Sequence, residues 1–304
     1  MTPNGLATML QRGPVVLDGG LATELEARGH DLAGPLWSAR LLRDRPGDIE
    51  GVHRAYFEAG ADVAITASYQ ASYEGFAAAG IGRDETTRLL RLGVELARHA
   101  RDAVRPDGLV AASVGPYAAV LADGSEYTGD YGPVTTERLA AVHRPRIAAL
   151  LGAKPDVLAF ETIPSIREVA ALVELLAEFS GVEAWMTFCC RDGERLSDGT
   201  PVEEAVRLAD GSGRLVAVGI NCTPPEHIEA LLERARATTG LPLLVYPNRG
   251  RTWDGAAHEW RGAGVDGFAP AVVTRWRERG ARGIGGCCGI GPDTIAGVAR
   301  TLRG

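Results

Sequence analysis

Eight short apolar runs are spaced along the sequence, and most of them are followed by a stretch with the apolar spacing of an amphipathic helix. The runs, each predicted as a β-strand, span residues 15–18, 62–66, 109–114, 156–160, 184–188, 215–220, 243–246 and 282–284. The predicted helices span residues 46–59, 84–104, 136–151, 165–179, 201–208, 225–237 and 294–302. Alternation at this spacing is typical of right-handed βαβ units with a parallel sheet. Eight units predict an α/β fold, a (β/α)8 barrel, with a doubly wound open sheet as the alternative.

The length of the chain agrees with this fold. A barrel of this type needs roughly 250 residues, so 304 residues leave room for insertions. We find no internal repeat, low-complexity tract or linker, and therefore expect one domain over residues 1–304. Two stretches exceed a minimal repeat, namely residues 29–61 and a Gly- and Tyr-rich loop at residues 115–134. Long loops in compact domains are usually functional.

The charge balance excludes several classes of partner. The 32 Lys and Arg residues are outnumbered by 39 Asp and Glu residues, which gives a net charge of −7. Nucleic acids and anionic membranes require clustered positive charge, so we expect neither as a partner. The sequence also has no apolar run of about 20 residues and no signal-peptide pattern at its start. We expect a cytoplasmic protein that acts on small molecules, and the sequence indicates no oligomeric state.

Three of the five cysteines follow predicted strands. Cys222 follows the sixth strand, and Cys287 and Cys288 follow the eighth. An odd number of cysteines does not suggest a secreted disulfide framework. In a barrel, the carboxyl ends of the strands converge on the face where active sites are built. Three thiolates there suit Zn²⁺, and three protein ligands with one open position are typical of a catalytic zinc site.

The adjacency of Cys287 and Cys288 requires an irregular backbone. Neighbouring side chains on a regular strand point to opposite faces, so both can bind one ion only where the chain leaves β geometry. Three glycines surround the pair and are predicted to supply positive φ angles: Gly285, Gly286 and Gly289. The alternative is that the pair consists of ordinary buried cysteines or forms a vicinal disulfide. Cys189 and Cys190 lack such glycines and are interpreted as small apolar residues.

Seven motifs at the predicted strand ends carry a family resemblance. In chain order they are Asp18-Gly19-Gly20, residues 66–72 (Thr-Ala-Ser-Tyr-Gln-Ala-Ser), residues 113–117 (Ser-Val-Gly-Pro-Tyr), Phe160-Glu161-Thr162, residues 219–222 (Gly-Ile-Asn-Cys), Tyr246-Pro247-Asn248 and residues 285–289 (Gly-Gly-Cys-Cys-Gly). Each motif alone is weak, but seven in order over nearly the whole chain are specific. Together they resemble the zinc-dependent homocysteine S-methyltransferases.

Within that family, the chain most resembles the branch that uses S-methylmethionine or S-adenosylmethionine. The compact length, the run at residues 66–72 and residues 121–127 carry this resemblance. The betaine-dependent branch usually has a Tyr directly after the Glu at the end of the fourth strand, where this chain has Thr162. The resemblance implies methyl transfer from a sulfonium donor to homocysteine, giving methionine. The alternatives are betaine as donor, another thiol or selenol as acceptor, or a non-catalytic structural or sensing zinc protein.

The resemblance also implies a homocysteine site. Asp18 and Glu161 would bind the α-ammonium group, with the amides of Gly19 and Gly20 near the carboxylate. Asn248 would fill the fourth zinc position when homocysteine is absent. The open alternatives are an N-cap role for Asp18, an ion pair with an Arg for Glu161, and a turn role for Asn248. Zinc suits this substrate, because an unperturbed thiol has a pKa of about 8.5 and only the thiolate is a good nucleophile.

The donor carries a sulfonium cation, which aromatic faces recognise. The candidate contacts for this cation are four tyrosines: Tyr69, Tyr117, Tyr127 and Tyr131. Glu126 or Asp130 is expected to meet the ammonium group of the donor. The alternative is that the loop at residues 115–134 is only a lid whose tyrosines pack on the rim of the barrel. None of the six histidines accompanies the cysteines, so we expect no histidine ligand.

Overall fold

Eight parallel strands form one sheet whose two edge strands meet. The computed structural model describes residues 5–32, 36–250, 252–254, 259–261, 264 and 267–304. In hydrogen-bonded order the strands are β1 (Val15–Val16), β10 (Ala281–Ile284), β7 (Leu243–Tyr246), β6 (Ala217–Asn221), β5 (Glu183–Phe188), β4 (Val157–Ile163), β3 (Leu109–Val114) and β2 (Val63–Ile65). A parallel bridge between Leu17 and Val63 joins the chain after β1 to β2. The bridge completes the circuit, and the predicted (β/α)8 barrel is confirmed.

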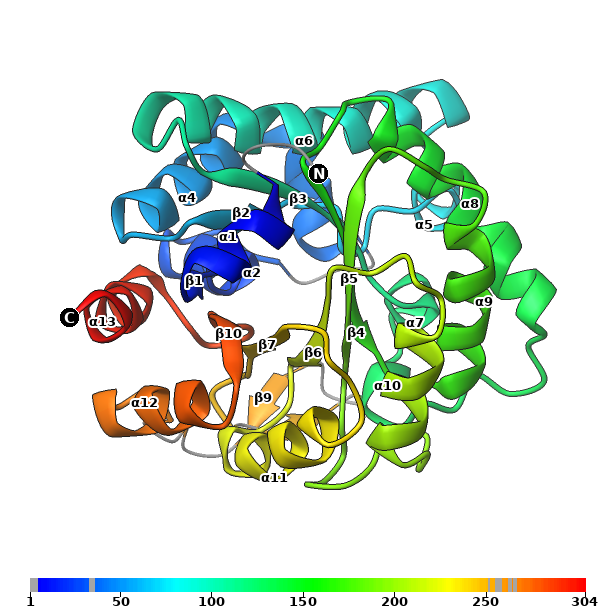
Figure 1. Ribbon diagram of the computed structural model, residues 1–304. Coiled ribbons are helices and arrows are strands. Elements are labelled where there is room, and N and C mark those ends of the chain that lie inside the picture. The colour runs from blue at the N-terminus through cyan, green and yellow to red at the C-terminus, as the bar shows by residue number, and fades with distance from the viewer. Residues whose placement is uncertain (1–4, 33–35, 251, 255–258, 262–263, 265–266) are drawn as a thin grey trace.

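Helices surround the strands on all sides (Figure 1). The seven predicted helices are present as α4 (Pro46–Glu58), α6 (Arg83–Val104), α8 (Thr136–Leu151), α9 (Ile166–Leu176), α10 (Val202–Asp210), α11 (Pro225–Arg236) and α13 (Pro292–Arg303). The structure adds elements that were not predicted: α1 (Leu6–Arg12), α2 (Leu21–Ala27), η1 (Trp37–Arg40), α3 (Leu41–Asp44), α5 (Tyr73–Ala78), α12 (Pro270–Glu278) and an antiparallel hairpin of β8 (Thr252–Asp254) and β9 (Glu259–Arg261). Within the described part of the chain, no helix is both long and apolar enough to cross a bilayer.

Alternate residues of each strand fill two separate apolar layers. Leu109 and Trp185 belong to a cluster made almost wholly of strand residues, which fills the inside of the barrel. Val110 and Met186 belong to a larger cluster that also contains residues of the surrounding helices. This period of two follows from the pleat of a strand, because successive side chains point to opposite faces. Inward-pointing residues at the carboxyl end of each strand therefore face the mouth of the barrel.

Helix α1 covers the opposite end of the barrel. Its Leu6 and Leu10 are fully buried in the inner apolar layer. The backbone N–H of Ala7 donates to the carboxylate of Glu183, and the guanidinium of Arg282 donates to the carbonyl of Leu10 at 2.9 Å. Both partners lie near the amino-terminal ends of their strands, β5 and β10. Helix α1 thus lies across the end of the barrel that is remote from the three cysteines.

The long loop after β3 contains regular structure. Residues 115–134 include α7 (Tyr117–Leu121) and the 3-10 turn η2 (Ser125–Tyr127). Three of its glycines have positive φ angles, and those of Gly129 (68°) and Gly132 (63°) turn the chain back toward α8. An added Cβ on Gly129 would lie 2.5 Å from the backbone nitrogen of Asp198, so the loop packs closely on the segment after β5. These contacts fix the path of the loop over one side of the mouth.

Candidate active site

The three cysteines singled out in the sequence meet at the mouth of the barrel. The Sγ atom of Cys288 lies 3.9 Å from that of Cys222 and 3.9 Å from that of Cys287. All three sulfur atoms lie within 4.8 Å of one another, and all five cysteines are free. Sulfur ligands about 2.3 Å from a tetrahedral zinc ion would be roughly 3.8 Å apart. The arrangement therefore fits a metal ion bound by three thiolates, and it holds no vicinal disulfide.

The backbone around the thiols is irregular, but partly for a different reason from the one expected. Gly289 has a φ of 83°, as predicted, and Cys222 itself has a φ of 48°. Gly285 and Gly286 are not among the residues with positive φ. An added Cβ would lie 2.6 Å from Cβ of Leu17 at Gly285 and 2.2 Å from Cγ2 of Ile290 at Gly286. These two glycines are required by close packing, and the prediction of positive φ at them was wrong.

Asp18 lies buried where β1 ends. Its Oδ2 accepts a hydrogen bond from the N–H of Ile65 at 2.8 Å, while Oδ1 has no partner among the residues that the structure describes. Burial raises the pKa of this carboxyl, and the nearby charge of Glu161 raises it further. Helix α2 has Gly20 at its N-cap and no side-chain cap. The N-cap alternative for Asp18 is therefore wrong, and one of its oxygens is free for a ligand.

The two glycines after Asp18 let neighbouring backbones approach. An added Cβ would lie 2.5 Å from the carbonyl oxygen of Ile290 at Gly19 and 2.7 Å from that of Cys287 at Gly20. The N–H of Gly20 donates to the carbonyl of Ile290 at 2.9 Å. This amide already has an acceptor, so it does not stand free for a substrate carboxylate. The main role that the structure gives Gly20 is to bring the loop of Cys287 close to Asp18.

Glu161 lies on β4 and faces the same mouth. The hydroxyl of Ser113 donates to its Oε1. Burial raises the pKa of Glu161 to about 7, and the charge of Cys222 contributes in the same direction. The one buried arginine nearby, Arg146, instead donates to the carbonyl oxygens of Ser68, Tyr69 and Gly115. No ion pair of Glu161 with an arginine is found within the described ranges, so the structure does not adopt that alternative.

Asn221 is a residue of the site that the sequence analysis did not single out. Its Oδ1 accepts from the N–H of Thr162 at 2.7 Å, and its Nδ2 donates to Oγ1 of Thr162 at 2.7 Å. Thr162 has a φ of 62°, which is rare for a β-branched residue. Glu161 and Cys222 are the chain neighbours of this pair. The available signal was a single Asn at the end of an otherwise apolar strand. The sequence alone does not show that its partner is Thr162, because the two residues meet only in the folded barrel.

Asn248 follows β7 and adopts the turn role. Its Oδ1 accepts from the N–H of Gly250 at 2.8 Å, and its Nδ2 donates to the carbonyl of Cys222 at 3.1 Å. Cys189 likewise contacts this carbonyl, with its Sγ at 3.6 Å. Both side chains therefore support the backbone of Cys222, and Cys190 is buried as expected.

The loop after β3 brings two of its predicted residues to the thiols. The hydroxyl of Tyr127 lies 3.6 Å from Sγ of Cys222, and hydrogen bonds from Cys287, Cys288 and Tyr127 lower the pKa of the Cys222 thiol. Oε2 of Glu126 is buried without a hydrogen-bond partner among the described residues. Burial raises the pKa of Glu126 to about 7. Glu126 thus resembles Asp18, because each carboxyl presents one free buried oxygen.

The other three predicted residues of the loop make contacts that do not involve the thiols. The hydroxyl of Tyr131 donates to Glu168 at 2.6 Å, and the ring of Tyr117 packs edge-on against that of Tyr131, with centroids 5.5 Å apart. Asp130 is exposed and accepts from the N–H of Gly132 at 2.9 Å. Tyr69 lies close to Gly115, where an added Cβ would lie 2.7 Å from its ring. Burial raises the pKa of Tyr69, and the nearby charges of Glu126 and Cys222 raise it further, so Tyr69 lies on the site side.

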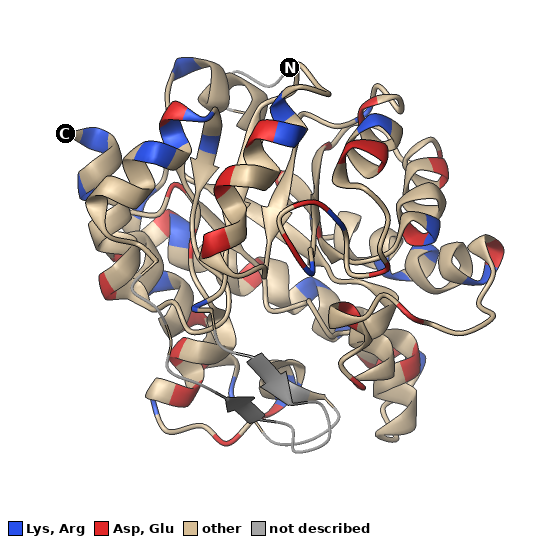
Figure 2. Cartoon of the chain, turned by 90° about the horizontal axis from the view of Figure 1, so that it is seen from below, with Lys and Arg blue, Asp and Glu red and all other residues tan. Residues whose placement is uncertain are grey.

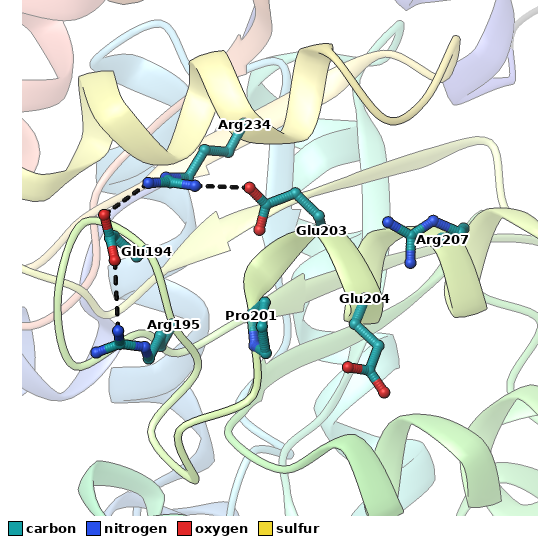
Figure 3. A pocket seen from close by; sticks show the side chains of 7 residues that line it. All are labelled: Glu194, Arg195, Pro201, Glu203, Glu204, Arg207 and Arg234. Carbon is teal, nitrogen blue, oxygen red and sulfur yellow. Dashed lines mark hydrogen bonds and ion pairs between the residues drawn. The ribbon is translucent and has the colours of Figure 1, made fainter.

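A second depression, outside this site, is lined by charged residues. It has a volume of about 510 Å³, and the guanidinium of Arg234 on α11 donates to Glu203 at 2.7 Å and to Glu194 at 2.6 Å (Figure 3). Arg234, Glu194, Glu203 and Arg195 are joined by ion pairs, and the depression shares no residue with the thiol site. Elsewhere, basic and acidic residues are interspersed along the helices (Figure 2).

Comparison with known proteins extends over the whole barrel. A family model described as Homocysteine S-methyltransferase matches residues 15–302. The chain is 46% identical over 298 residues to Homocysteine S-methyltransferase YbgG of Bacillus subtilis, covering 95% of this chain and 94% of that protein. It is 46% identical over 303 residues to Homocysteine S-methyltransferase of Escherichia coli, covering 97% of each. The crystal structure of the metallated form of the homocysteine methyltransferase MmuM from Escherichia coli has a TM-score of 0.87 and 46% identity, covering 97% of this chain and 98% of that one.

Proposed function

This chain belongs to the homocysteine S-methyltransferase family, and from that premise we propose that it transfers a methyl group from S-methylmethionine or S-adenosylmethionine to the sulfur of homocysteine. The observation that carries the proposal is the position of two carboxyl groups beside three clustered thiols. Asp18 and Glu126 each present a buried oxygen without a hydrogen-bond partner in the described part of the chain. Two amino-acid substrates bring two ammonium groups, and each needs an acceptor of this kind.

The thiols of Cys222, Cys287 and Cys288 would hold a zinc ion. Their sulfur spacing and soft character fit zinc, and the three side chains leave one position for a further ligand. When bound there, zinc supplies a Lewis acid that favours the thiolate form of a sulfur ligand. Asn248 donates to the carbonyl of Cys222, and the hydroxyl of Tyr127 lies 3.6 Å from its sulfur, so both residues would orient this ligand.

Asp18 and Glu161 would bind the ammonium group of homocysteine. Both carboxyls face the mouth of the barrel, and the pKa of each is raised because burial disfavours its charge. An ammonium group restores the charged form of the carboxyls, since opposite charges stabilise each other in a site shielded from water. Ser113 and the backbone of Ile65 hold one oxygen of each carboxyl in place. The other oxygen of Asp18 has no hydrogen-bond partner among the described residues and would accept from the ammonium group.

Glu126 and Tyr127 would bind the donor. Glu126 suits a donor with an α-ammonium group, whereas betaine carries no N–H to donate. Tyr127, and Tyr69 beside the same loop, offer aromatic faces to the sulfonium cation. Aromatic faces stabilise the sulfonium cation less strongly than a direct ion pair does. The cation loses its charge during the reaction, so weaker stabilisation of the bound donor adds less to the barrier.

The transfer itself balances without an oxidant or reductant. The homocysteine thiol releases its proton to solvent, and its sulfur forms a bond to the donor methyl carbon as the bond from that carbon to the donor sulfur breaks. The electron pair of the broken bond stays on the donor sulfur, which becomes a neutral thioether. From S-methylmethionine, both products are methionine. We also propose a cytosolic location, because five free thiols suit a reducing compartment.

One assay tests the activity and the donor together. The purified protein is incubated with homocysteine and, in separate reactions, with S-methylmethionine, S-adenosylmethionine or betaine, each labelled with deuterium in the transferable methyl group. Labelled methionine from a sulfonium donor supports the proposal. Labelled methionine from betaine alone would instead identify the betaine-dependent reaction. A protein that binds zinc and forms no methionine from any donor would be the non-catalytic alternative.

A further inference from the structure

A fully buried carboxylate, that of Glu168 on α9, accepts hydrogen bonds from three different segments. Its Oε1 accepts from the backbone N–H of Tyr117 at 2.6 Å and from Nε2 of His143 on α8 at 2.7 Å. Its Oε2 accepts from the hydroxyl of Tyr131 at 2.6 Å. Glu168 lies in the first turn of α9, where the helix dipole favours a negative charge. Both its oxygens are thus satisfied by donors of the protein, unlike those of Asp18 and Glu126.

Two of these three donors belong to the loop after β3. Tyr117 begins α7 and Tyr131 lies just before α8, so Glu168 holds the loop at its start and near its end. The rings of Tyr117 and Tyr131 also meet edge to face, at an angle of 83°. Helices α8 and α9 lie side by side in Figure 1. Glu168 on α9 therefore contacts both His143 on α8 and the start of α7.

The segment between the two held ends carries the residues that reach the thiols. It contains Glu126, with its free oxygen, and Tyr127, whose hydroxyl lies 3.6 Å from Sγ of Cys222. Asp18 and Glu161 are held by other contacts, to Ile65 and Ser113. The hydrogen bonds of Glu168 therefore hold the segment of Glu126 and Tyr127 and do not hold Asp18 or Glu161.

We propose that Glu168 is a positioning residue for the donor, which acts by holding both ends of the loop that presents Glu126 and Tyr127. This inference rests on the proposed function for the identity of the donor. The loop attachment itself does not depend on it. Loss of one end of the attachment weakens donor binding and leaves zinc and homocysteine binding in place.

Tyr131→Phe tests the attachment with the smallest change. It removes one hydroxyl and keeps the ring contact with Tyr117. Tyr73→Phe is the matched control, because the Tyr73 hydroxyl is also partly buried and lies 2.8 Å from Oγ1 of Thr87, a residue of α6 outside the loop. Glu168→Ala is less suitable, because it leaves three donors unpaired in the interior and endangers the fold.

Hydrogen–deuterium exchange of the zinc-loaded protein supplies a readout that needs no turnover. Tyr131→Phe is expected to speed exchange of backbone amides in residues 115–134 about tenfold, which is the range for loss of a hydrogen bond to a charged group. The rest of the barrel and the whole of the control variant should exchange as the parent protein does. Unchanged exchange in residues 115–134 would overturn the proposal.

Steady-state kinetics then separate the donor from homocysteine. The KM for S-methylmethionine is expected to rise about tenfold in Tyr131→Phe, while the KM for homocysteine and the zinc content stay within about twofold. Equal increases in both KM values would make Glu168 a general structural residue and overturn the proposal. If the parent protein forms no methionine, the proposed function fails, and the exchange experiment still decides whether Glu168 holds the loop.

Discussion

The side chain of Asn221 makes two hydrogen bonds to Thr162, one to its N–H and one to its hydroxyl, each 2.7 Å long. Thr162 is held in the left-handed region with a φ of 62°, where a β-branched residue is strained by roughly 1–3 kcal/mol. The register between β4 and β5 shifts at this point, between Phe160 and Ile163. Glu161 continues the inner positions of Val157 and Ala159 on β4, so it faces the mouth of the barrel just before Thr162. Asn221 thereby links the residue after Glu161 on β4 to the residue before Cys222, which directly follows β6.

Removal of this amide should affect both neighbours. Asn221→Ala is expected to lower the free energy of unfolding by about 1–3 kcal/mol, because it leaves buried polar groups of Thr162 unpaired. Urea unfolding of the variant measures this loss. In the double variant with Thr162→Val the combined loss should be smaller than the sum of the two single losses. Additive losses would show that the two side chains do not act as a pair.

Replacing any one of the three clustered cysteines should remove the metal. Cys222→Ser, Cys287→Ser and Cys288→Ser are each expected to lose bound zinc and methyl transfer while the circular dichroism spectrum stays that of the folded barrel. Cys190→Ser is the matched control, since Cys190 is buried but lies outside the cluster, and it should keep one zinc per chain. Full zinc in the three variants, measured by elemental analysis, would reject the assignment.

Neutral isosteres of the two carboxylates should weaken homocysteine binding. Asp18→Asn and Glu161→Gln leave the substrate ammonium partly unpaired, which costs about 1–3 kcal/mol, or roughly ten- to a hundredfold in affinity. Isothermal titration of the zinc-loaded variants with homocysteine measures the effect. Zinc content should not change, and unchanged affinity in both variants would leave the residues with structural roles only.

The same pair has a pH signature. The pKa of Glu161 is about 7, so its charged form, which an ammonium group requires, becomes populated as the pH rises through neutrality. Homocysteine affinity should increase over this range by more in the parent protein than in Glu161→Gln. Identical pH profiles would contradict the role of Glu161.

Stability should fall in mild acid because of His53. This residue on α4 is fully buried, neither ring nitrogen has a partner in the described part of the chain, and burial lowers its pKa from 6.5 to about 4. The unfolded chain binds the proton more tightly, so stability is intact above pH 6.5 and declines as the pH falls toward 4. A gap of about 2.5 pKa units corresponds to about 3 kcal/mol. Unfolding at pH 7 and pH 4.5 should show this loss relative to His53→Leu, and an equal response of both proteins would exclude His53 as the cause.

Among the loop residues, Glu126 and Tyr127 should select the donor. Glu126→Gln and Tyr127→Leu are expected to raise the KM for a sulfonium donor roughly tenfold with a smaller effect on homocysteine. Tyr73→Leu provides the comparison, because Tyr73 lies outside residues 115–134 and its hydroxyl contacts Thr87. Steady-state kinetics with each substrate varied in turn measures the difference. Equal effects on both substrates would mean that the loop does not select the donor.

The sequence could predict which residues after the strands come together, because the carboxyl ends of all strands in a parallel barrel meet on one face. Cys222 and Cys287 could therefore be brought together from their positions alone. Asn221 and Glu168 could not, because each acts through partners that only the folded chain places beside it. Helix α1 was missed since seven residues are too few for a clear periodicity. Gly285 and Gly286 were identified as necessary, but the demand for space came from Leu17 and Ile290, which no local pattern reveals.

In the described part of the chain, α1 covers one end of the barrel and side chains fill its interior, so substrates are expected to enter and leave through the mouth. On the proposed function, homocysteine would bind at the strand ends and the donor would bind against the loop of residues 115–134. Homocysteine would then bind before the donor, and the methionine formed from it would leave after the spent donor. We therefore expect ordered binding and release, with inhibition by excess donor that binds while the acceptor site is empty.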